Sequence, residues 1–400
     1  MEFGPILRTL LRNKTRMILI VMEVALTLAI VVNSINMMQD MQFKMMRPTG
    51  IDEENIITIR SRPFSQEFKE DGYFANARQA DLDLLRSLPG VRSAEAFSGI
   101  PLSGSGSSYG CKPLGSEINT LGTAMLDAGP DAVETLGIEL ISGRDITEDD
   151  INEADSKNVL ITKAYADRLF PDGDAVGKRL QTNTQETQFT IVGIIGYMHG
   201  FWPGWQYLEH VMIRPNKPGG FNLGIFYMVR VEPGQMEDLL ASIETKMLAL
   251  NDGRNVTIRP LSEIKSETYE AEKAVVNMLR AVIALLIFVT ALGMIGMTSF
   301  SVTERTHHIG TRRALGARKV DILRYFLTEN WIITTIGVLV GTGLAYGLNY
   351  LLVDLVSGVK LDWLLLFYGI LLMWVVGQLS AFLPAWEGAR TSPAVATRNV

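Results

Sequence analysis

Four stretches of this 400-residue chain are long and apolar enough to cross a lipid bilayer as helices. Such a helix needs about 20 mostly apolar residues, because it rises about 1.5 Å per residue through a hydrocarbon core about 30 Å thick. The four windows are residues 17–35, 275–300, 331–353 and 363–383. Residues 36–274 separate the first window from the second. The spacing predicts four transmembrane helices, with one large domain inserted between helix 1 and helix 2.

Lysine and arginine are distributed unevenly over the flanks of these windows. They gather before the first window and in residues 301–330, whereas the turn between the third and fourth windows has only Lys360. Because basic flanks stay in the cytoplasm, we expect both termini and residues 301–330 to be cytoplasmic, and residues 36–274 to be extracytoplasmic. Residues 1–16 are amphipathic and predict a helix along the inner membrane surface, and residues 384–400 form a cytoplasmic tail. The first window is expected to be an uncleaved anchor, since its apolar run is long and no small-residue cleavage site follows.

Two charged residues, Glu23 and Arg280, stand inside the predicted membrane helices. An intramembrane charge is a candidate functional group by default. The heights of the two residues in the bilayer differ by more than about 10 Å, so a direct ion pair is not expected. We interpret Arg280 as reaching outward to the membrane surface and Glu23 as facing a neighbouring helix.

The inserted segment alternates between strand-like and helix-like patterns. Runs rich in β-branched residues and bounded by turn residues predict strands at ENIITIR, NVLIT, FTIVGII, HVMIRP and IFYMVRV. Amphipathic runs predict helices at QADLDLLRSL, TKAYADRLF and GQMEDLLASIETKMLAL. The fold class is therefore an α+β membrane protein, in which a mixed α+β domain with a helical stalk occupies residues 36–274.

The sequence offers no convincing catalytic, cofactor or metal site. Cys111 is the only cysteine, so it forms no internal disulfide and no cysteine cluster, and we expect it to be a small, partly buried residue. The run from Gly173 to Lys178 has too few residues between its glycines for a phosphate loop, and Arg179 stands where Ser or Thr is needed. The adjacent His307 and His308 point in different directions on a helix. The net charge of −6 argues against a nucleic-acid partner.

Residues 198–210, MHGFWPGWQYLEH, concentrate aromatic side chains around a Pro-Gly pair. An exposed loop of this kind would contact an apolar substrate or partner. The alternative is that the rings close the bottom of the domain or rest at the membrane interface, and we favour this alternative. The candidate contact residues are Phe201, Trp202, Trp205 and Tyr207.

A specific motif follows the second window directly. It consists of Glu304-Arg305, Ile309-Gly310 and Arg312-Arg313-Ala314-Leu315-Gly316-Ala317. This pattern resembles the permease family of MacB and FtsX, and the resemblance extends over nearly the whole chain. The stretches GIELISGRDITEDD, VLITKAYADRLFPDGDAVGKRL and FTIVGIIGYMHG look like the extracytoplasmic domain of that family, and PAWEGARTSPAVATRNV looks like its C-terminal end.

The resemblance implies a permease subunit in the bacterial inner membrane that is not itself an enzyme. A separate cytoplasmic ATPase subunit would bind ATP and Mg, so this chain would hold no cofactor. A second permease, identical or paralogous, would form a dimer through the first two membrane helices. By mechanotransmission, ATP-driven movement of the outer domains would export a peptide, antibiotic or lipid-linked substrate, with a periplasmic adaptor and outer-membrane channel as further candidate partners. Two alternatives stay open: an FtsX-type signal transducer that regulates cell-wall hydrolases, and lipoprotein extraction for sorting.

The basic motif is expected to couple the permease to its ATPase. We expect the second membrane helix to continue from Thr303 to Leu315, to stop at Gly316, and to be followed by a helix that starts near Arg318. The expected coupling residues are Glu304, Arg305, Ile309, Gly310, Arg312, Arg313, Leu315 and Gly316. In this hypothesis the apolar members enter a groove of the ATPase, and the basic members contact its surface or lipid headgroups. A plain basic loop that binds anionic lipid is the alternative. His308 departs from the family pattern, which usually has an acidic residue there, and this leaves the choice of ATPase open.

Overall fold

The computed structural model describes residues 14–70, 72–116, 122–152, 157–182, 187–219, 224–356 and 360–390. The chain divides into two units. A helical unit comprises Met1–Met45 and Glu272–Val400, and an α/β unit comprises Met46–Ala271. Most of the predicted N-terminal amphipathic helix and of the predicted C-terminal tail lies outside the described residues.

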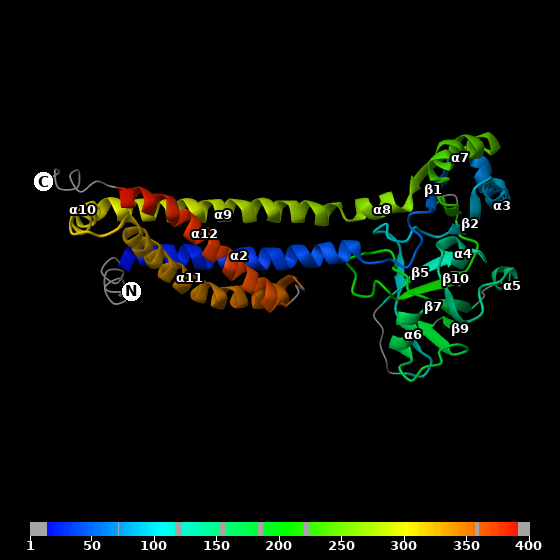
Figure 1. The fold of residues 1–400 in the computed structure, drawn as a ribbon. Helices are drawn as coiled ribbons and strands as arrows, with labels where there is room; N and C mark the ends of the chain where they lie inside the picture. Colours follow the sequence, from blue (N-terminus) through cyan, green and yellow to red (C-terminus); the bar gives the residue numbers. More distant parts are fainter. Residues whose placement is uncertain are drawn as a thin grey trace. The chain divides into compact units, whose positions relative to one another are not determined.

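Each of the four apolar windows lies within one long helix of the structure (Figure 1). These helices are long and apolar enough to cross a membrane. They are α2 (Lys14–Met46), α9 (Glu270–Glu304), α11 (Lys319–Val356) and α12 (Trp363–Arg390). Most of them extend past the apolar window at both ends, because hydropathy marks only the part of a helix suited to lipid. The prediction of four membrane helices around one inserted domain is confirmed.

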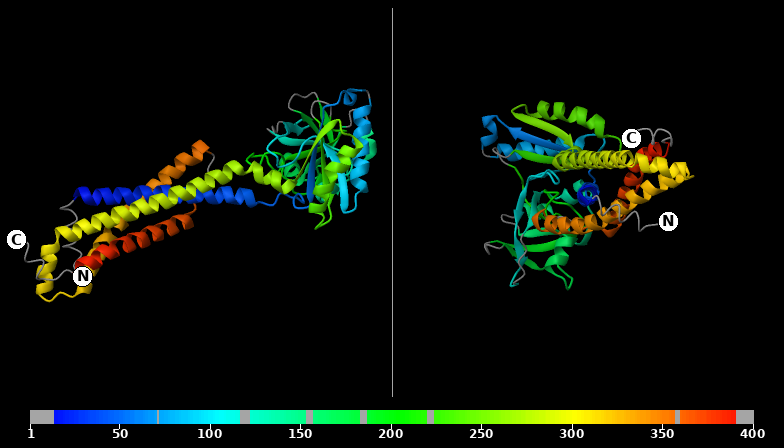
Figure 2. Two further views of the ribbon diagram at one scale, coloured as in Figure 1. Left: turned by 90° about the horizontal axis from the view of Figure 1, so that it is seen from above. Right: turned by 90° about the vertical axis from the view of Figure 1, so that its left-hand side faces the viewer.

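Helix α2 is the centre of the helical unit. In the most apolar stretch of α2, 56% of the residues are buried within the chain, compared with 11% in α9. Figure 2 shows α2 end-on, with α9, α11 and α12 around it. Glycines allow this close approach, since a Cβ atom added at Gly341 would lie 2.9 Å from the Cα of Ala25, and one at Gly369 would lie 2.3 Å from Val32 Cγ2. At these glycines the helix backbone lies close to the backbone or a side chain of α2, and small residues at such contacts are typical of membrane helices.

Glu23 faces a neighbouring helix, as predicted. A Cβ atom added at Gly293 of α9 would lie 2.4 Å from Glu23 Oε1, so the missing side chain makes room for the carboxylate. One turn further along, the hydroxyls of Thr27 and Thr290 lie 2.7 Å apart. Arg280 donates a hydrogen bond to Asn277 Oδ1 at 3.1 Å instead of pairing with the carboxylate of Glu23. The contact between α2 and α9 is thus partly polar.

The described strands of the α/β unit form one twelve-stranded mixed sheet. Its order is β12-β1-β11-β2-β5-β10-β7-β9-β8-β4, with β3 paired to β5 and β6 paired to β9. The strands are β1 (Ile56–Pro63), β2 (Val91–Phe97), β3 (Ser107–Tyr109), β4 (Cys111–Pro113), β5 (Thr123–Ala128), β6 (Leu140–Gly143), β7 (Asn158–Thr162), β8 (Arg179–Thr182), β9 (Gln188–Ile195), β10 (Val211–Pro215), β11 (Ile225–Val231) and β12 (Arg254–Pro260). All five predicted strand segments are confirmed.

Helices lie over both faces of this sheet (Figure 1). The helical segments are η1 (Gln66–Lys69), α3 (Tyr73–Ser87), α4 (Ala132–Leu136), α5 (Glu148–Asn152), α6 (Lys163–Leu169), α7 (Met236–Leu250) and α8 (Leu261–Thr268). The predicted helices correspond to α3, α6 and α7, although α3 begins earlier than expected. Apolar side chains of α3 and α7 bury one face of β1, β11 and β2. Within this layer Arg254 Nη2 pairs with Asp81 Oδ1 at 2.7 Å, and Tyr227 donates to Asp81 Oδ2 at 2.6 Å.

A second layer forms where α6 packs on β7 and β9. Its core includes Tyr165 and Cys111, both fully buried. Burial raises the pKa of the Cys111 thiol to about 11. Cys111 is therefore a packing residue, as predicted, although it is more deeply buried than expected, and its thiol is protonated at neutral pH.

Candidate functional site

The segment that carries the basic motif forms a short helix, α10 (Thr306–Ala314), between α9 and α11. Figure 1 shows it at one end of the helical unit. The helix ends in a Schellman turn, in which Ala317 N donates to Arg312 O at 3.0 Å and Gly316 N donates to Arg313 O at 3.2 Å. Gly316 has φ +98°, a value that glycine adopts without strain. The predicted stop at Gly316 is confirmed, and α11 begins at Lys319, close to the predicted start.

The expectation of one unbroken helix from the second membrane helix to Leu315 is wrong. Helix α9 ends at Glu304, and α10 begins at Thr306. Arg305 between them has φ −102° and ψ 14°, which are outside the helical range. The break occurs where both side chains of the Glu-Arg pair are held by other helices.

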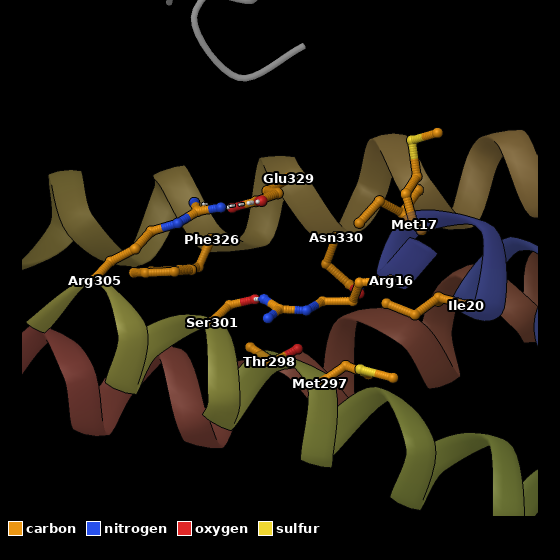
Figure 3. A pocket seen from close by; sticks show the side chains of 11 residues that line it. Arg16, Met17, Ile20, Met297, Thr298, Ser301, Arg305, Phe326, Glu329 and Asn330 are labelled. Carbon is orange, nitrogen blue, oxygen red and sulfur yellow. Dashed lines mark hydrogen bonds and ion pairs between the residues drawn. The ribbon is translucent and has the colours of Figure 1, made fainter. Parts of the chain in front are cut away.

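The Glu-Arg pair connects the end of α9 to α2 and α11. Figure 3 shows the contact of Arg305 with Glu329. Arg305 Nη1 and Nη2 donate to Glu329 Oε2 and Oε1 of α11, at 2.8 and 3.0 Å. Glu304 Oε2 accepts a 3.2 Å bond from Arg16 Nη2 of α2, and Arg16 Nη1 also donates to Ser301 Oγ at 2.9 Å. Three membrane helices are thereby joined at the α10 end of the helical unit by two adjacent residues.

A small cavity of about 30 Å³ lies beside this network. Its lining comes from α2, α9 and α11, and Figure 3 shows Arg16 reaching across it toward Ser301. A space of this size and polarity has room for about one or two water molecules. The charged groups of the network therefore lie next to a cavity of mixed polar and apolar lining and not against a fully packed apolar core.

The two apolar residues expected at a partner surface are placed differently. Leu315 is 83% exposed, so α10 presents it to the surroundings. Ile309 is 4% exposed and packs against Ile322, Phe326 and Ala385. Ile309 does not offer its side chain to a partner, because the side of α10 that carries it lies against α11 and α12. Gly310 is buried beside it, whereas Arg312 is exposed and Arg313 is half-buried.

Sequence reasoning missed Glu329 and the role of Arg16. Both stand just outside the apolar windows, where charged residues are common. A signal was present, since Arg305 and Glu329 lie near the same membrane edge on consecutive apolar segments. A half-buried cation there needs a counter-charge.

The aromatic stretch between β9 and β10 packs on its own domain. Phe201 is 2% exposed, and its ring fills space left by Gly99 and Gly106. Trp202 and Trp205 lie edge-to-face with ring centroids 5.2 Å apart, and both pack on the core under the sheet. The ring centroid of Tyr207 lies 5.4 Å from that of Trp205. These contacts favour the interpretation that the rings close the domain.

His199 of the same stretch is also buried, at 1% exposure. Its Nε2 lies 2.5 Å from the hydroxyl of Tyr197. Burial, with smaller contributions from the positive charges of Arg47 and Lys265, lowers the pKa of His199 to about 4. The imidazole is therefore neutral at physiological pH, and it acts as a packing and hydrogen-bonding group.

Two family models match the chain. The MacB-like periplasmic core domain matches residues 17–246, and the FtsX-like permease C-terminal domain matches residues 280–393. The macrolide export ATP-binding/permease protein MacB of Marinobacter nauticus is 27% identical over 58% of this chain. The uncharacterized ABC transporter permease YknZ of Bacillus subtilis is 26% identical over 66% of it. The chain spans 37% of the length of that MacB protein and 67% of the length of YknZ.

A solved structure also resembles part of the chain. The periplasmic region of MacB from Actinobacillus actinomycetemcomitans covers 55% of this chain and 95% of its own, with 15% identity and a TM-score of 0.35. The family assignment rests on the two domain models, which together match both the inserted domain and the C-terminal helices. This chain belongs to the MacB-like, FtsX-type permease family of ABC transporters.

Proposed function

We propose that the chain is the permease subunit of a MacB-type ABC transporter, driven by a separate ATPase subunit at the cytoplasmic face of a bacterial inner membrane. The observation that carries this proposal is the α10 segment. It presents Leu315 and Arg312 on its exposed side and is joined through Arg305 and Glu304 to three membrane helices. A partner that binds the exposed side of α10 can therefore displace α2, α9 and α11 together.

In this proposal the α10 segment is a mechanical link. The ATPase binds ATP and Mg, and its closure moves α10 relative to the membrane. The ion pairs carry the movement into α9, and through α9 into the extracytoplasmic domain, which exports a peptide, antibiotic or lipid-linked substrate. The buried side of α10, with Ile309 against α11 and α12, keeps the segment from bending away under load.

A second permease subunit completes the proposed transporter. Helix α9 buries only 11% of its most apolar stretch within this chain, and its exposed apolar residues include Leu285, Phe288 and Leu292. This surface supports pairing with an identical or paralogous permease, as well as contact with lipid. Both termini face the cytoplasm in this arrangement. A periplasmic adaptor and an outer-membrane channel remain candidate further partners.

The decisive experiment changes the exposed leucine of α10. Leu315→Asp places a charge in an apolar groove of the ATPase and is expected to abolish co-purification with the co-expressed ATPase, because burying an unpaired charge is costly. Leu250→Asp makes the same change at an exposed residue of α7, 48% exposed, and should leave association intact. Arg312→Ala should be milder, at about 1 kcal/mol or less.

The outcome that contradicts the proposal is equally clear. If Leu315→Asp retains full ATPase association and transport-linked hydrolysis, α10 is not the coupling element. The purified chain alone should neither bind nor hydrolyse ATP. Hydrolysis by the chain alone would show that the ATPase is not a separate subunit.

A further inference from the structure

A hollow of about 370 Å³ opens on one face of the α/β sheet, over strands β12, β1 and β11. The other face of these strands is covered by α3 and α7. The volume falls in the range of small-molecule sites, about 300–1,000 Å³. We call this space the β1 hollow. All of its lining residues belong to the α/β unit.

The strand register determines which side chains form the floor of the β1 hollow. Arg60 of β1 is paired with Thr257 of β12 on one side and with Phe226 of β11 on the other. The three side chains therefore form a row across the sheet on the face opposite α3 and α7. Two residues back along β1, Thr58 is paired with Arg259 in the next row. The floor thus combines cationic, hydroxyl and aromatic groups.

The walls of the β1 hollow are fixed to one another. One wall is α8, which contributes Ile264 and Glu267, and the other is the Gly/Ser loop of residues 98–106. The hydroxyl of Thr268 at the end of α8 donates to Leu102 O in the loop at 2.7 Å. Leu102 is buried with φ +64°, a strained value for a residue with a side chain, and its N–H donates to Gly200 O at 3.0 Å. Strain of this kind persists where the surroundings impose it, and it is concentrated at binding sites.

The charges around the β1 hollow leave one cation unmatched. Arg259 pairs with Glu263 at 3.0 Å and also with Glu267, so both carboxylates near the rim are already neutralised. Among the residues that the structure describes, no carboxylate pairs with Arg60. Its guanidinium lies over the ring of Phe226, 5.4 Å from the centroid, which leaves the donors at its edge available. The group that would complete this site is an anion.

We propose that the β1 hollow binds a small amphipathic molecule in which an apolar group is joined to a carboxylate. The carboxylate pairs with the edge of Arg60, for which a planar two-oxygen group is the best geometric match. The apolar part lies against Ile100, Ile264 and the free edge of Phe226. The hydroxyls of Thr257 and Ser103 are within the lining to accept or donate further hydrogen bonds. This site is a property of the α/β unit alone and does not depend on the proposed function.

The probe for this proposal is N-acetyl-L-phenylalanine, measured against its neutral amide by isothermal titration calorimetry on the full chain in lipid nanodiscs. The two compounds share one shape and differ in the anionic charge. We expect the acid to bind with a Kd of about 1 mM or tighter, since a ligand of this size has limited affinity. The amide should bind at least about tenfold more weakly, because it lacks the charge-assisted bond to Arg60.

Two variants test the location, each with a matched control. Arg60→Gln should weaken binding of the acid by about tenfold or more, whereas Arg62→Gln removes the same charge from the same strand outside the hollow and should change little. Thr257→Trp should block the hollow, whereas Asn255→Trp places the same ring two residues away on β12. Both tryptophans are tolerated by an exposed edge strand, and thermal unfolding of each variant verifies the fold.

Several results would overturn the proposal. One is the absence of saturable binding to the wild-type chain at about 10 mM acid. Equal binding of the acid and the amide would show that the hollow does not select an anion. Equal losses in Arg60→Gln and Arg62→Gln would show only general charge attraction. If Thr257→Trp fails to fold, the comparison of Arg60→Gln with Arg62→Gln decides the question alone.

Discussion

Arg305 and Glu329 form a two-bonded ion pair in which both side chains are mostly withdrawn from water, at 15% and 9% exposure. The neighbouring pair of Arg16 and Glu304 is more open, at 20% and 48%. Two parallel hydrogen bonds fix the direction of a guanidinium as well as its distance. The first pair is therefore suited to holding α9 against α11, and the second pair adds a weaker contact with α2.

Breaking the Arg305–Glu329 pair should destabilise the helical unit. Arg305→Ala leaves the buried Glu329 carboxylate without a partner, and we expect a loss of about 3 kcal/mol in unfolding free energy. Arg305→Lys should recover only part of this loss, because an ammonium group cannot make the two parallel bonds. Thermal unfolding in detergent measures the effect. Glu304→Gln is the control, and its expected cost is about 1 kcal/mol or less. Equal losses for Arg305→Ala and Glu304→Gln would refute the distinction between the two pairs.

The stability of the α/β unit should fall in mild acid because of His199. Burial holds the pKa of this imidazole at about 4 in the folded chain, below its ordinary 6.5. Between these values the unfolded chain binds the proton and the folded chain does not, so stability is full above pH 6.5 and declines as the pH falls toward 4. We expect a loss of about 2 kcal/mol at pH 5 relative to pH 7.5. His199→Gln should flatten the pH dependence, measured by chemical unfolding, and an unchanged slope in this variant would exclude His199 as the cause.

Gly106 should tolerate no side chain, because of its contact with Phe201. A Cβ atom there would lie 2.2 Å from two carbon atoms of the Phe201 ring, and a ring in a packed core has little freedom to move. We expect Gly106→Ala to cost about 1–3 kcal/mol of unfolding free energy. Gly204→Ala is the control, since a Cβ atom there would meet nothing within 4 Å. In a double-mutant cycle with Phe201→Leu, additive costs would show that the two positions do not interact.

The topology can be tested by thiol labelling. Cys111 is fully buried with a raised pKa, so a membrane-impermeant thiol reagent should label it only after unfolding. In a Cys111→Ser background, Ser116→Cys should be labelled in intact spheroplasts, and Arg318→Cys only after the membrane is opened. The reverse pattern would invert the predicted orientation.

Hydropathy and periodicity were sufficient to predict the membrane helices and the strands, because both depend on local patterns of apolar residues. They did not predict the break at Arg305, which depends on partners that are distant in the sequence, Glu329 above all. They also failed to place Ile309. An isoleucine in a polar stretch has the same local pattern whether it faces a partner protein or its own helices. The aromatic stretch illustrates the same limit, since the fit of Phe201 between Gly99 and Gly106 is visible only in three dimensions.

The central place of α2 has a consequence for how the chain is made. This helix precedes the other three in the chain, and the glycines that receive it, Gly341 and Gly369, follow it by about 300 residues or more. At about 5–20 residues per second, α2 waits roughly tens of seconds in the membrane before its neighbours exist. Throughout that interval its polar groups, including Glu23 and Asn33, lack the helices that cover them. Biogenesis therefore requires that α2 be sheltered by the insertion machinery, or by another membrane protein, until the C-terminal helix arrives.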